Sequence, residues 1–227
     1  MRVLRGREAT IEADRERTAR MLAEAGERRE PTLRVWSPYR QLAFGRRDTH
    51  EVGYDRAVEI AREHGFPPVE RSVGGRAVAY TGTTLAFAHA MPIDDPRRGM
   101  AERYGRTTER VRKGLRTVGV DAERGEPPES FCPGDHSLSA SGKLVGIAQR
   151  ITSKSALVSG VAIVDGHEEI AAVLEPVYDA LSVPFDPGSV GSVARAGGDA
   201  DPERVARAIE SALLDGEEPR PERIGQM

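Results

Sequence analysis

The sequence predicts an α+β fold in which a mixed, mainly antiparallel sheet is flanked by helices. Apolar or alternating stretches come in hairpin-like groups bounded by Gly and Pro, and amphipathic helical patterns stand between the groups. The regular strand-helix alternation of a parallel sheet is not present. The length of 227 residues suits a single domain. We expect its core at about residues 31–195, with peripheral helices before and after that range.

Helices are predicted wherever apolar residues recur on one helical face. Gly119 should stop the long helix in the middle of the chain. Asp201 as N-cap and Pro202 as first residue should begin the last helix, and Pro176 is expected to break or bend the helix before it. The expected helices are residues 7–26, 54–64, 100–118, 167–181 and 202–214.

Strands are predicted from short apolar or alternating runs. Ser37-Pro38 should join the first two strands as a hairpin, and Ser141-Gly142 should join a second hairpin after the polar loop 121–134. The three strands that follow Pro67 are expected to be neighbours in one sheet. The expected strands are residues 33–36, 41–44, 69–73, 76–80, 83–90, 136–140, 143–150 and 156–164.

The composition excludes several classes of function. Acidic and basic side chains nearly cancel, with a formal net charge of -3, and the basic ones are scattered, so we expect no nucleic acid partner. No apolar run is long enough to cross a bilayer, and the first ten residues lack the apolar centre of an export signal. We therefore expect no membrane association and a cytoplasmic location.

The cysteine and histidine content argues against a metal centre. The chain has 1 Cys, which cannot form an intramolecular disulfide and fits a reducing compartment. The 5 His residues are dispersed, and no CxxC or HxH spacing occurs. We assign no metal ligand.

A glycine pair between two expected strands is the first candidate for chemistry. Gly74 and Gly75 can adopt backbone angles closed to other residues and let a ligand touch the main chain. Arg71 and Arg76 on either side offer planar donors to a carboxylate or phosphate. The alternative is a tight turn with surface arginines. A GxxxxGK[ST] phosphate loop is excluded, because no Lys-Ser or Lys-Thr follows the glycines.

The free cysteine is the second candidate. Pro133-Gly134 favours a type II turn, which would place Cys132 at the lip of a turn entering a strand, within reach of a substrate. Alternatively, Cys132 is a small apolar side chain in the core, as most free cysteines are. His136 is close enough in sequence to be considered as its base, although proximity in sequence does not establish the geometry.

A lysine at the entry of an expected strand is the third candidate. Lys143 could donate to a developing oxyanion or to a phosphate, and Gly146 would let a ligand or a neighbouring backbone come close. The alternative is an ordinary hairpin lysine that points to water.

Together these segments resemble the lipoate ligase and octanoyltransferase superfamily, which is related to the biotin ligase catalytic domain. The superfamily's arginine and Gly-Gly-x-Ala-Val element lines the acyl site. It is matched here by Arg71, Gly74, Gly75, Ala77 and Val78, with Arg76 at the variable position. The lysine element is matched by Gly142, Lys143, Gly146, Ala148 and Gln149. The resemblance implies a biotin/lipoate protein ligase-like catalytic domain in which Lys143 contacts the acyl carbonyl.

The Cys-Pro-Gly element resembles the cysteine-dependent branch of this superfamily and implies that Cys132 is the nucleophile. The implied function is transfer of an octanoyl or lipoyl group through a Cys132 thioester to a lysine of a lipoyl carrier domain, with no cofactor. Lys143 would stabilise the oxyanion and favour the thiolate. The implied carriers are the glycine cleavage H protein and the 2-oxoacid dehydrogenase E2.

Two other functions stay open on the sequence. One is an ATP-dependent lipoate-protein ligase that acts through lipoyl-AMP with ATP and Mg²⁺, in which Cys132 is structural. Ligases commonly carry His and Asp soon after the Ala-Val element, where this chain has Tyr80-Thr81-Gly82, and this favours transfer over adenylation. The other is a non-catalytic subunit that binds lipoyl domains.

Overall fold

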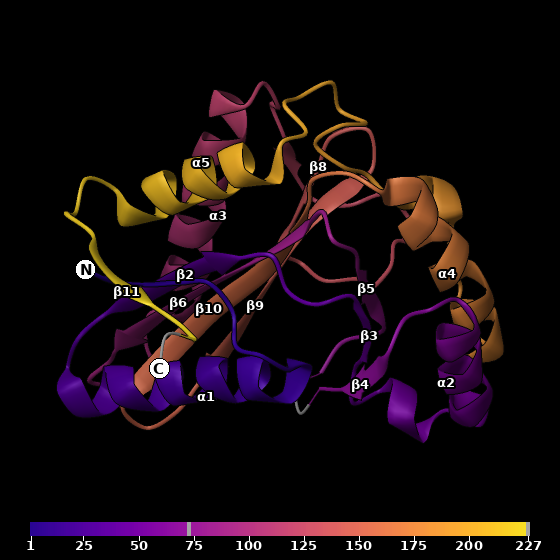
Figure 1. The fold of residues 1–227 in the computed structure, drawn as a ribbon, viewed down its shortest axis with the longest axis horizontal. Helices are drawn as coiled ribbons and strands as arrows, with labels where there is room; N and C mark the ends of the chain where they lie inside the picture. The colour runs from indigo at the N-terminus through magenta and orange to yellow at the C-terminus, as the bar shows by residue number, and fades with distance from the viewer. Residues whose placement is uncertain (72–73, 226–227) are drawn as a thin grey trace.

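The computed structural model describes residues 1–71 and 74–225. An eight-stranded mixed sheet crosses the molecule in the order β11-β1-β2-β6-β10-β9-β8-β7 (Figure 1). Its pairs are antiparallel except β1 with β11 and β1 with β2, which are parallel. This confirms the predicted mixed, mainly antiparallel sheet. The strands are β1 (Arg2–Arg5), β2 (Thr32–Trp36), β6 (Thr84–Pro92), β7 (Glu123–Arg124), β8 (Ser137–Ser139), β9 (Lys143–Ile151), β10 (Ser155–Ile163) and β11 (Arg220–Arg223).

A second sheet of three short strands lies beside the first (Figure 1). It contains β4 (Pro68–Glu70), β3 (Gln41–Phe44) and β5 (Val78–Tyr80), in that order. The prediction of a hairpin across Ser37-Pro38 is therefore wrong, because β2 and β3 belong to different sheets. The three strands after Pro67 are not neighbours either: β3 separates β4 from β5, and β6 lies in the main sheet. Of the expected strand 69–73, residues 72 and 73 lie outside the described residues.

Within the described residues, five α-helices match the five predicted ones. They are α1 (Ile11–Arg28), α2 (Tyr54–Glu63), α3 (Met100–Thr117), α4 (His167–Ala180) and α5 (Pro202–Leu214). Asp201 caps α5 as predicted, accepting from the backbone N–H groups of Glu203 and Arg204. Helix α1 starts later than predicted, because Thr10 caps it. Pro176 lies inside α4 without ending it.

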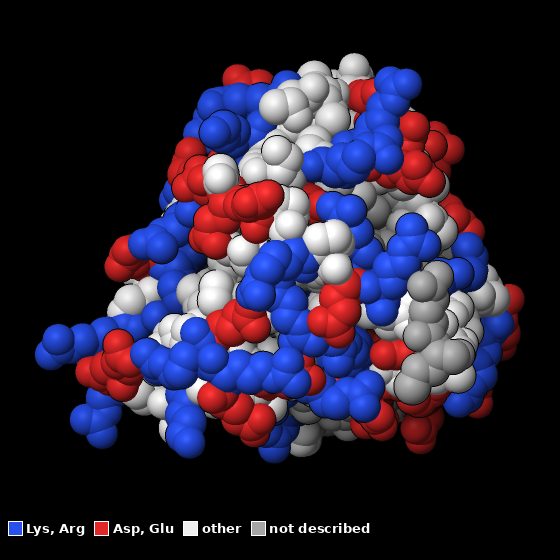
Figure 2. All heavy atoms as spheres, turned by 60° about the vertical axis from the view of Figure 1, so that its left-hand side comes forward, with Lys and Arg blue, Asp and Glu red and all other residues white. Residues whose placement is uncertain are grey.

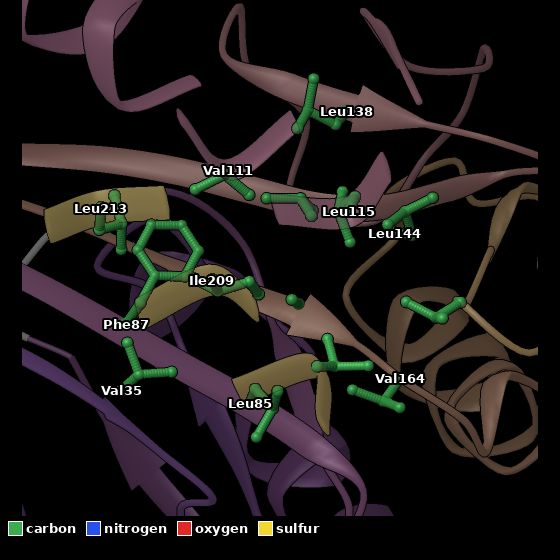
Figure 3. Packing of buried hydrophobic residues seen from close by; sticks show 14 of the residues in the cluster. Val35, Leu85, Phe87, Val111, Leu115, Leu138, Leu144, Val164, Ile209 and Leu213 are labelled. Carbon is green, nitrogen blue, oxygen red and sulfur yellow. The ribbon is translucent and has the colours of Figure 1, made fainter. Parts of the chain in front are cut away.

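Alternation along β6 divides the main core into two layers. Leu85 and Phe87 face α3 and α5, whereas Ala88 and Ala90 face α1. Figure 3 shows Ile209 and Leu213 of α5 packed close to this sheet, and both side chains are fully buried. Burying a side chain of this size contributes about 1.5–3 kcal/mol. The core therefore extends past residue 195 into a helix that we expected to be peripheral.

A second buried cluster joins the small sheet to α2 and α4. It includes Phe44 of β3, Tyr178 of α4 and Phe131, which precedes the cysteine. The loop between β7 and β8 is thus anchored on the small sheet by an aromatic side chain. This packing places the cysteine-bearing loop against the strand entry at Ala77.

No helix of the described residues is long and apolar enough to cross a membrane.

Candidate functional site

Cys132 lies in the loop between β7 and β8 and is partly exposed. Its backbone adopts the left-handed region with φ 41°, which is uncommon for a residue other than Gly. The predicted type II turn is wrong, because it requires a positive φ at Gly134, and Gly134 is not among the glycines with positive φ. Contacts on both sides of Cys132, described below, hold the loop in this conformation instead.

The thiol lies against the glycine pair. Cys132 Sγ accepts a hydrogen bond from the backbone N–H of Arg76 at 3.3 Å, and Arg71 Nη2 is 3.9 Å away. Gly75 has φ 96°, and a Cβ there would stand 2.9 Å from Sγ. The first two candidate segments therefore meet, and the atom that touches the glycine main chain is the cysteine sulfur.

Arg71 lies beside two ionisable side chains, Tyr80 and Cys132. Burial opposes its ionisation, but Tyr80 and Cys132 face it, and the pKa of Arg71 is raised overall. Its Nη2 also donates to the carbonyl of Arg76. The guanidinium thus stays charged while it ties the two ends of the glycine segment together.

Lys143 is buried, with 1% of its surface exposed, so the alternative of a hairpin lysine pointing to water is wrong. Its Nζ donates to Glu126 Oε2 at 2.6 Å and to the carbonyls of Phe131 and Cys132 at 2.9 and 2.8 Å. An ammonium group has three protons, and each has an acceptor here. Lys143 therefore holds the backbone of the cysteine loop directly.

Two further residues complete the site, and the sequence analysis missed both. Glu126 accepts from Lys143, from Ser137 Oγ at 2.7 Å and from the N–H of Gly134 at 2.9 Å. Its carboxylate offsets the free-energy cost of burying the Lys143 ammonium group. A buried lysine requires such a partner, but sequence spacing does not say which of the many Glu residues supplies it.

Tyr178 of α4 is the second missed residue. Its hydroxyl accepts from the N–H of Cys132 at 2.7 Å and donates to the carbonyl of Ala77 at 3.0 Å. Burial raises the pKa of Tyr178 well above its ordinary value, so the hydroxyl stays protonated. In the sequence, Tyr178 looks like one more residue on the apolar face of a helix.

The remaining predicted site residues are placed less directly. The side chains of Ala77 and Val78 are buried in the core beside the small sheet. A Cβ at Gly146 would contact Lys143 Cε at 3.7 Å, so Gly146 lies beside the lysine stem. Ala148 is exposed on β9.

The side chains of Gln149 and His136 both contact α3. Gln149 Oε1 accepts from Arg103 Nε at 2.5 Å, and Gln149 Nε2 donates to the carbonyl of Met100 at 3.3 Å. The His136 ring stacks on Tyr104 with their centroids 3.7 Å apart. These contacts turn both side chains toward α3, and the structure gives no support to His136 as the base for Cys132.

An open hollow of about 490 Å³ adjoins the glycine pair. We call it the basic hollow, and it is lined by Arg46, Arg47, His50, Glu51, Gly74 and Arg76. Beneath it Arg76 Nη1 pairs with Glu51 Oε1 at 2.6 Å and with the fully buried Asp48 at 3.3 Å. Burial raises the pKa of Asp48, although the Gly45 N–H and Arg76 oppose that rise.

Within residues 1–71 and 74–225, no group of three or more His, Cys, Asp or Glu side chains could hold a metal ion.

Solved structures define the class of the fold. The chain is similar to a lipoate-protein ligase A bound with ATP, with a TM-score of 0.74 and 20% identity over 99% of this chain and 89% of that one. It is also similar to a bipartite lipoate protein ligase from Thermoplasma acidophilum, with a TM-score of 0.71 and 18% identity over 99% and 87%. The fold is that of a lipoate-protein ligase catalytic domain.

The family follows from the sequence comparison. The model of the lipoyl protein ligase A/B catalytic domain matches residues 15–213, so the chain belongs to this family. An octanoyl-[GcvH]:protein N-octanoyltransferase of Bacillus velezensis is 31% identical over 52% of this chain and 42% of that protein. A lipoyl-[GcvH]:protein N-lipoyltransferase of Listeria monocytogenes is 30% identical over 60% and 50%. The chain spans about half the length of these relatives.

Proposed function

We propose that this chain transfers an octanoyl or lipoyl group to a lysine of a lipoyl carrier domain through a thioester on Cys132. The observation that carries the proposal is the setting of the sulfur, which accepts from Arg76 N–H at 3.3 Å and lies 3.9 Å from the Arg71 guanidinium. Both donors stabilise negative charge on sulfur, which is the nucleophilic form of a thiol. Similarity to an octanoyl-[GcvH]:protein N-octanoyltransferase and to a lipoyl-[GcvH]:protein N-lipoyltransferase supports the same transfer.

The reaction would proceed in two displacements. Cys132 Sγ gives up its proton and adds to the acyl carbonyl carbon of the donor, which forms the C–S bond. Collapse of the tetrahedral adduct restores the carbonyl and breaks the bond between that carbon and the donor group, which leaves with the proton that the thiol gave up. The neutral amine of the acceptor lysine then adds to the thioester carbonyl, the C–S bond breaks, and the amine proton is lost to solvent. The sulfur returns to its place between Arg71 and Arg76.

In this reaction Lys143 positions the cysteine loop. Because its three protons bond to Glu126 and to the carbonyls of Phe131 and Cys132, it fixes the backbone from which the thiol projects. Direct donation to an acyl oxygen or a nucleotide phosphate would require Lys143 to give up one of these acceptors. Arg71 and the Arg76 N–H therefore stabilise the charge at sulfur.

The decisive experiment incubates the protein with an octanoylated carrier and an apo lipoyl domain, with and without ATP, and measures intact masses. We expect transfer without ATP and an acyl adduct on Cys132, and we expect Cys132→Ala to abolish both. Both the H protein and the E2 lipoyl domain should be tried as acceptors.

Two results would overturn the thioester scheme. If Cys132→Ser kept near-normal lipoylation from free acid with ATP and Mg²⁺, the chain would be a ligase. If the purified protein bound the carrier but transferred no acyl group from any donor, it would be a binding subunit.

A further inference from the structure

The lining of the basic hollow carries more basic than acidic side chains. Arg46 and Arg47 are exposed, and no ion pair involves their guanidinium groups within the described part of the chain. The one acidic lining residue, Glu51, is already paired with Arg76. His50 Nδ1 donates to the carbonyl of Arg46 at 2.8 Å. Among the described residues, the hollow therefore presents two arginines, neighbours in the sequence, whose guanidinium groups have no carboxylate partner.

This arrangement differs from much of the surface. On the face shown in Figure 2, basic and acidic groups lie side by side over most of the area. Such ion pairs lie within one helix, as between Arg56 and Glu63 of α2, or join distant segments, as between Arg110 of α3 and Asp215. Exposed charges paired in this way have little attraction left for a partner. The charges of Arg46 and Arg47 can still attract an acidic partner.

Residues that line the hollow are also in contact, directly or through the next residue, with the sulfur of Cys132. Arg76 lines it with its side chain while its backbone N–H bonds to Cys132 Sγ. Gly74 also lines it, and the next residue, Gly75, packs against the same sulfur. The segment of Gly74 to Arg76 therefore lies between a molecule seated in the hollow and the thiol.

We propose that the basic hollow receives acidic side chains of the carrier domain, close to the lysine that exchanges the acyl group. This inference rests on the proposed function. Charged lining residues do not suit an acyl chain, whereas planar guanidinium groups bind carboxylates in a bidentate manner. Val52, the residue after Glu51 in the sequence, is fully exposed, and an exposed apolar side chain next to a lining residue fits a protein surface better than a free phosphate. The partner is an acidic protein surface.

The test distinguishes binding of the carrier domain from acyl transfer at Cys132. The double variant R46E/R47E is compared with the parent protein in two reactions: acylation of Cys132 by a small octanoyl thioester, and transfer to an apo carrier domain. We expect the first rate to stay within about twofold and the KM for the carrier to rise about tenfold, because charges at an interface act mainly on association. The dependence of that KM on salt should also weaken in the variant.

A matched control reverses two exposed arginines outside the hollow. Neither Arg97 nor Arg150 lines it, and both are exposed. R97E/R150E makes the same change in net charge and should leave the KM for the carrier within about twofold of the parent value. Changing acidic residues beside the carrier's acceptor lysine to lysine should restore its reaction with R46E/R47E.

Several outcomes would overturn the inference. An unchanged KM for the carrier in R46E/R47E would do so, as would an equal loss in both reactions or an equal effect of the control. Displacement of the carrier by ATP at constant ionic strength, with salt itself without effect, would assign the hollow to a nucleotide. If the parent formed no acyl adduct at all, the proposed function would fail instead. Calorimetric titration of both proteins with apo carrier would then still test the docking.

Discussion

Tyr178 and Cys132 are joined by a 2.7 Å hydrogen bond from the backbone N–H of the cysteine to the tyrosine hydroxyl. The same hydroxyl donates to the carbonyl of Ala77, at the entry to β5. The Tyr178 hydroxyl of α4 therefore bonds both to the cysteine loop and to the segment that enters β5, and the thiol lies between these two segments. The position of the sulfur depends on a helix that contributes no reactive group.

Tyr178→Phe should loosen this arrangement without emptying the core, because the ring stays. We expect a loss of about 1–2 kcal/mol in the free energy of unfolding, since the part-buried N–H of Cys132 and the buried C=O of Ala77 each lose their partner. We also expect kcat for transfer to fall several-fold and the alkylation rate of Cys132 by iodoacetamide to change. Tyr54→Phe is the control, because that hydroxyl bonds to Glu70 away from the cysteine. Equal alkylation rates in both variants would contradict this role.

Gly75→Ala should disturb the thiol directly. Its φ of 96° disfavours any residue with a Cβ, and the new methyl group would stand 2.9 Å from Cys132 Sγ. We expect a loss of about 1–2 kcal/mol in stability together with at least tenfold lower transfer activity. Gly74→Ala is the matched control, since a Cβ there meets nothing within 4 Å. Chemical denaturation and transfer rates measured on both variants check the prediction, which fails if the two behave alike.

Lys143→Met should destabilise the protein even though methionine fills similar space. The substitution leaves Glu126 part-buried without its cation and removes both bonds to the loop carbonyls. Removing one partner of a buried ion pair costs about 3–5 kcal/mol. The double variant with Glu126→Gln should regain part of that loss. Urea unfolding of the parent, both single variants and the double variant measures the coupling; a coupling near zero would contradict the ion pair.

His89 should make the protein less stable at acid pH. Burial, together with Arg110 and Arg106, lowers its pKa from 6.5 to about 4. Between these values the unfolded chain binds a proton that the folded chain does not, so the contribution to stability present above pH 6.5 is lost as the pH falls. Below about pH 4 both states are protonated and the loss is complete, on the order of 3 kcal/mol. In His89→Leu, the unfolding free energy should fall less between pH 7 and pH 4; identical profiles would contradict this.

Local patterns predicted those parts of the fold that depend on local chemistry. The helices follow from apolar periodicity and caps such as Asp201, and the β8–β9 hairpin follows from Ser141-Gly142, where both residues have positive φ. The partners of β2 and β3 could not be predicted, because strand pairing is decided by segments distant in the chain. Strands β1 and β11 were missed since each is short and rich in arginine.

In the candidate site, too, local sequence predicted some features, whereas others depend on distant segments. Motif matching identified the segments of Arg71, Cys132 and Lys143, and the structure brings them together; their catalytic roles stay predictions. It did not indicate that Lys143 is buried, nor that Glu126 and Tyr178 hold the loop. Those facts depend on which side chains fill the space beneath the loop, and residue spacing carries no such information.

The left-handed backbone of Cys132 has a consequence for how this loop can change. Glycine is the residue that this conformation favours, and any other residue there costs about 1–2 kcal/mol. A Cys132→Gly chain would thus relax at the very position that holds its single sulfhydryl. Higher stability favours glycine at this position, whereas the proposed thioester chemistry requires cysteine, so selection for heat resistance alone would tend to remove the proposed nucleophile.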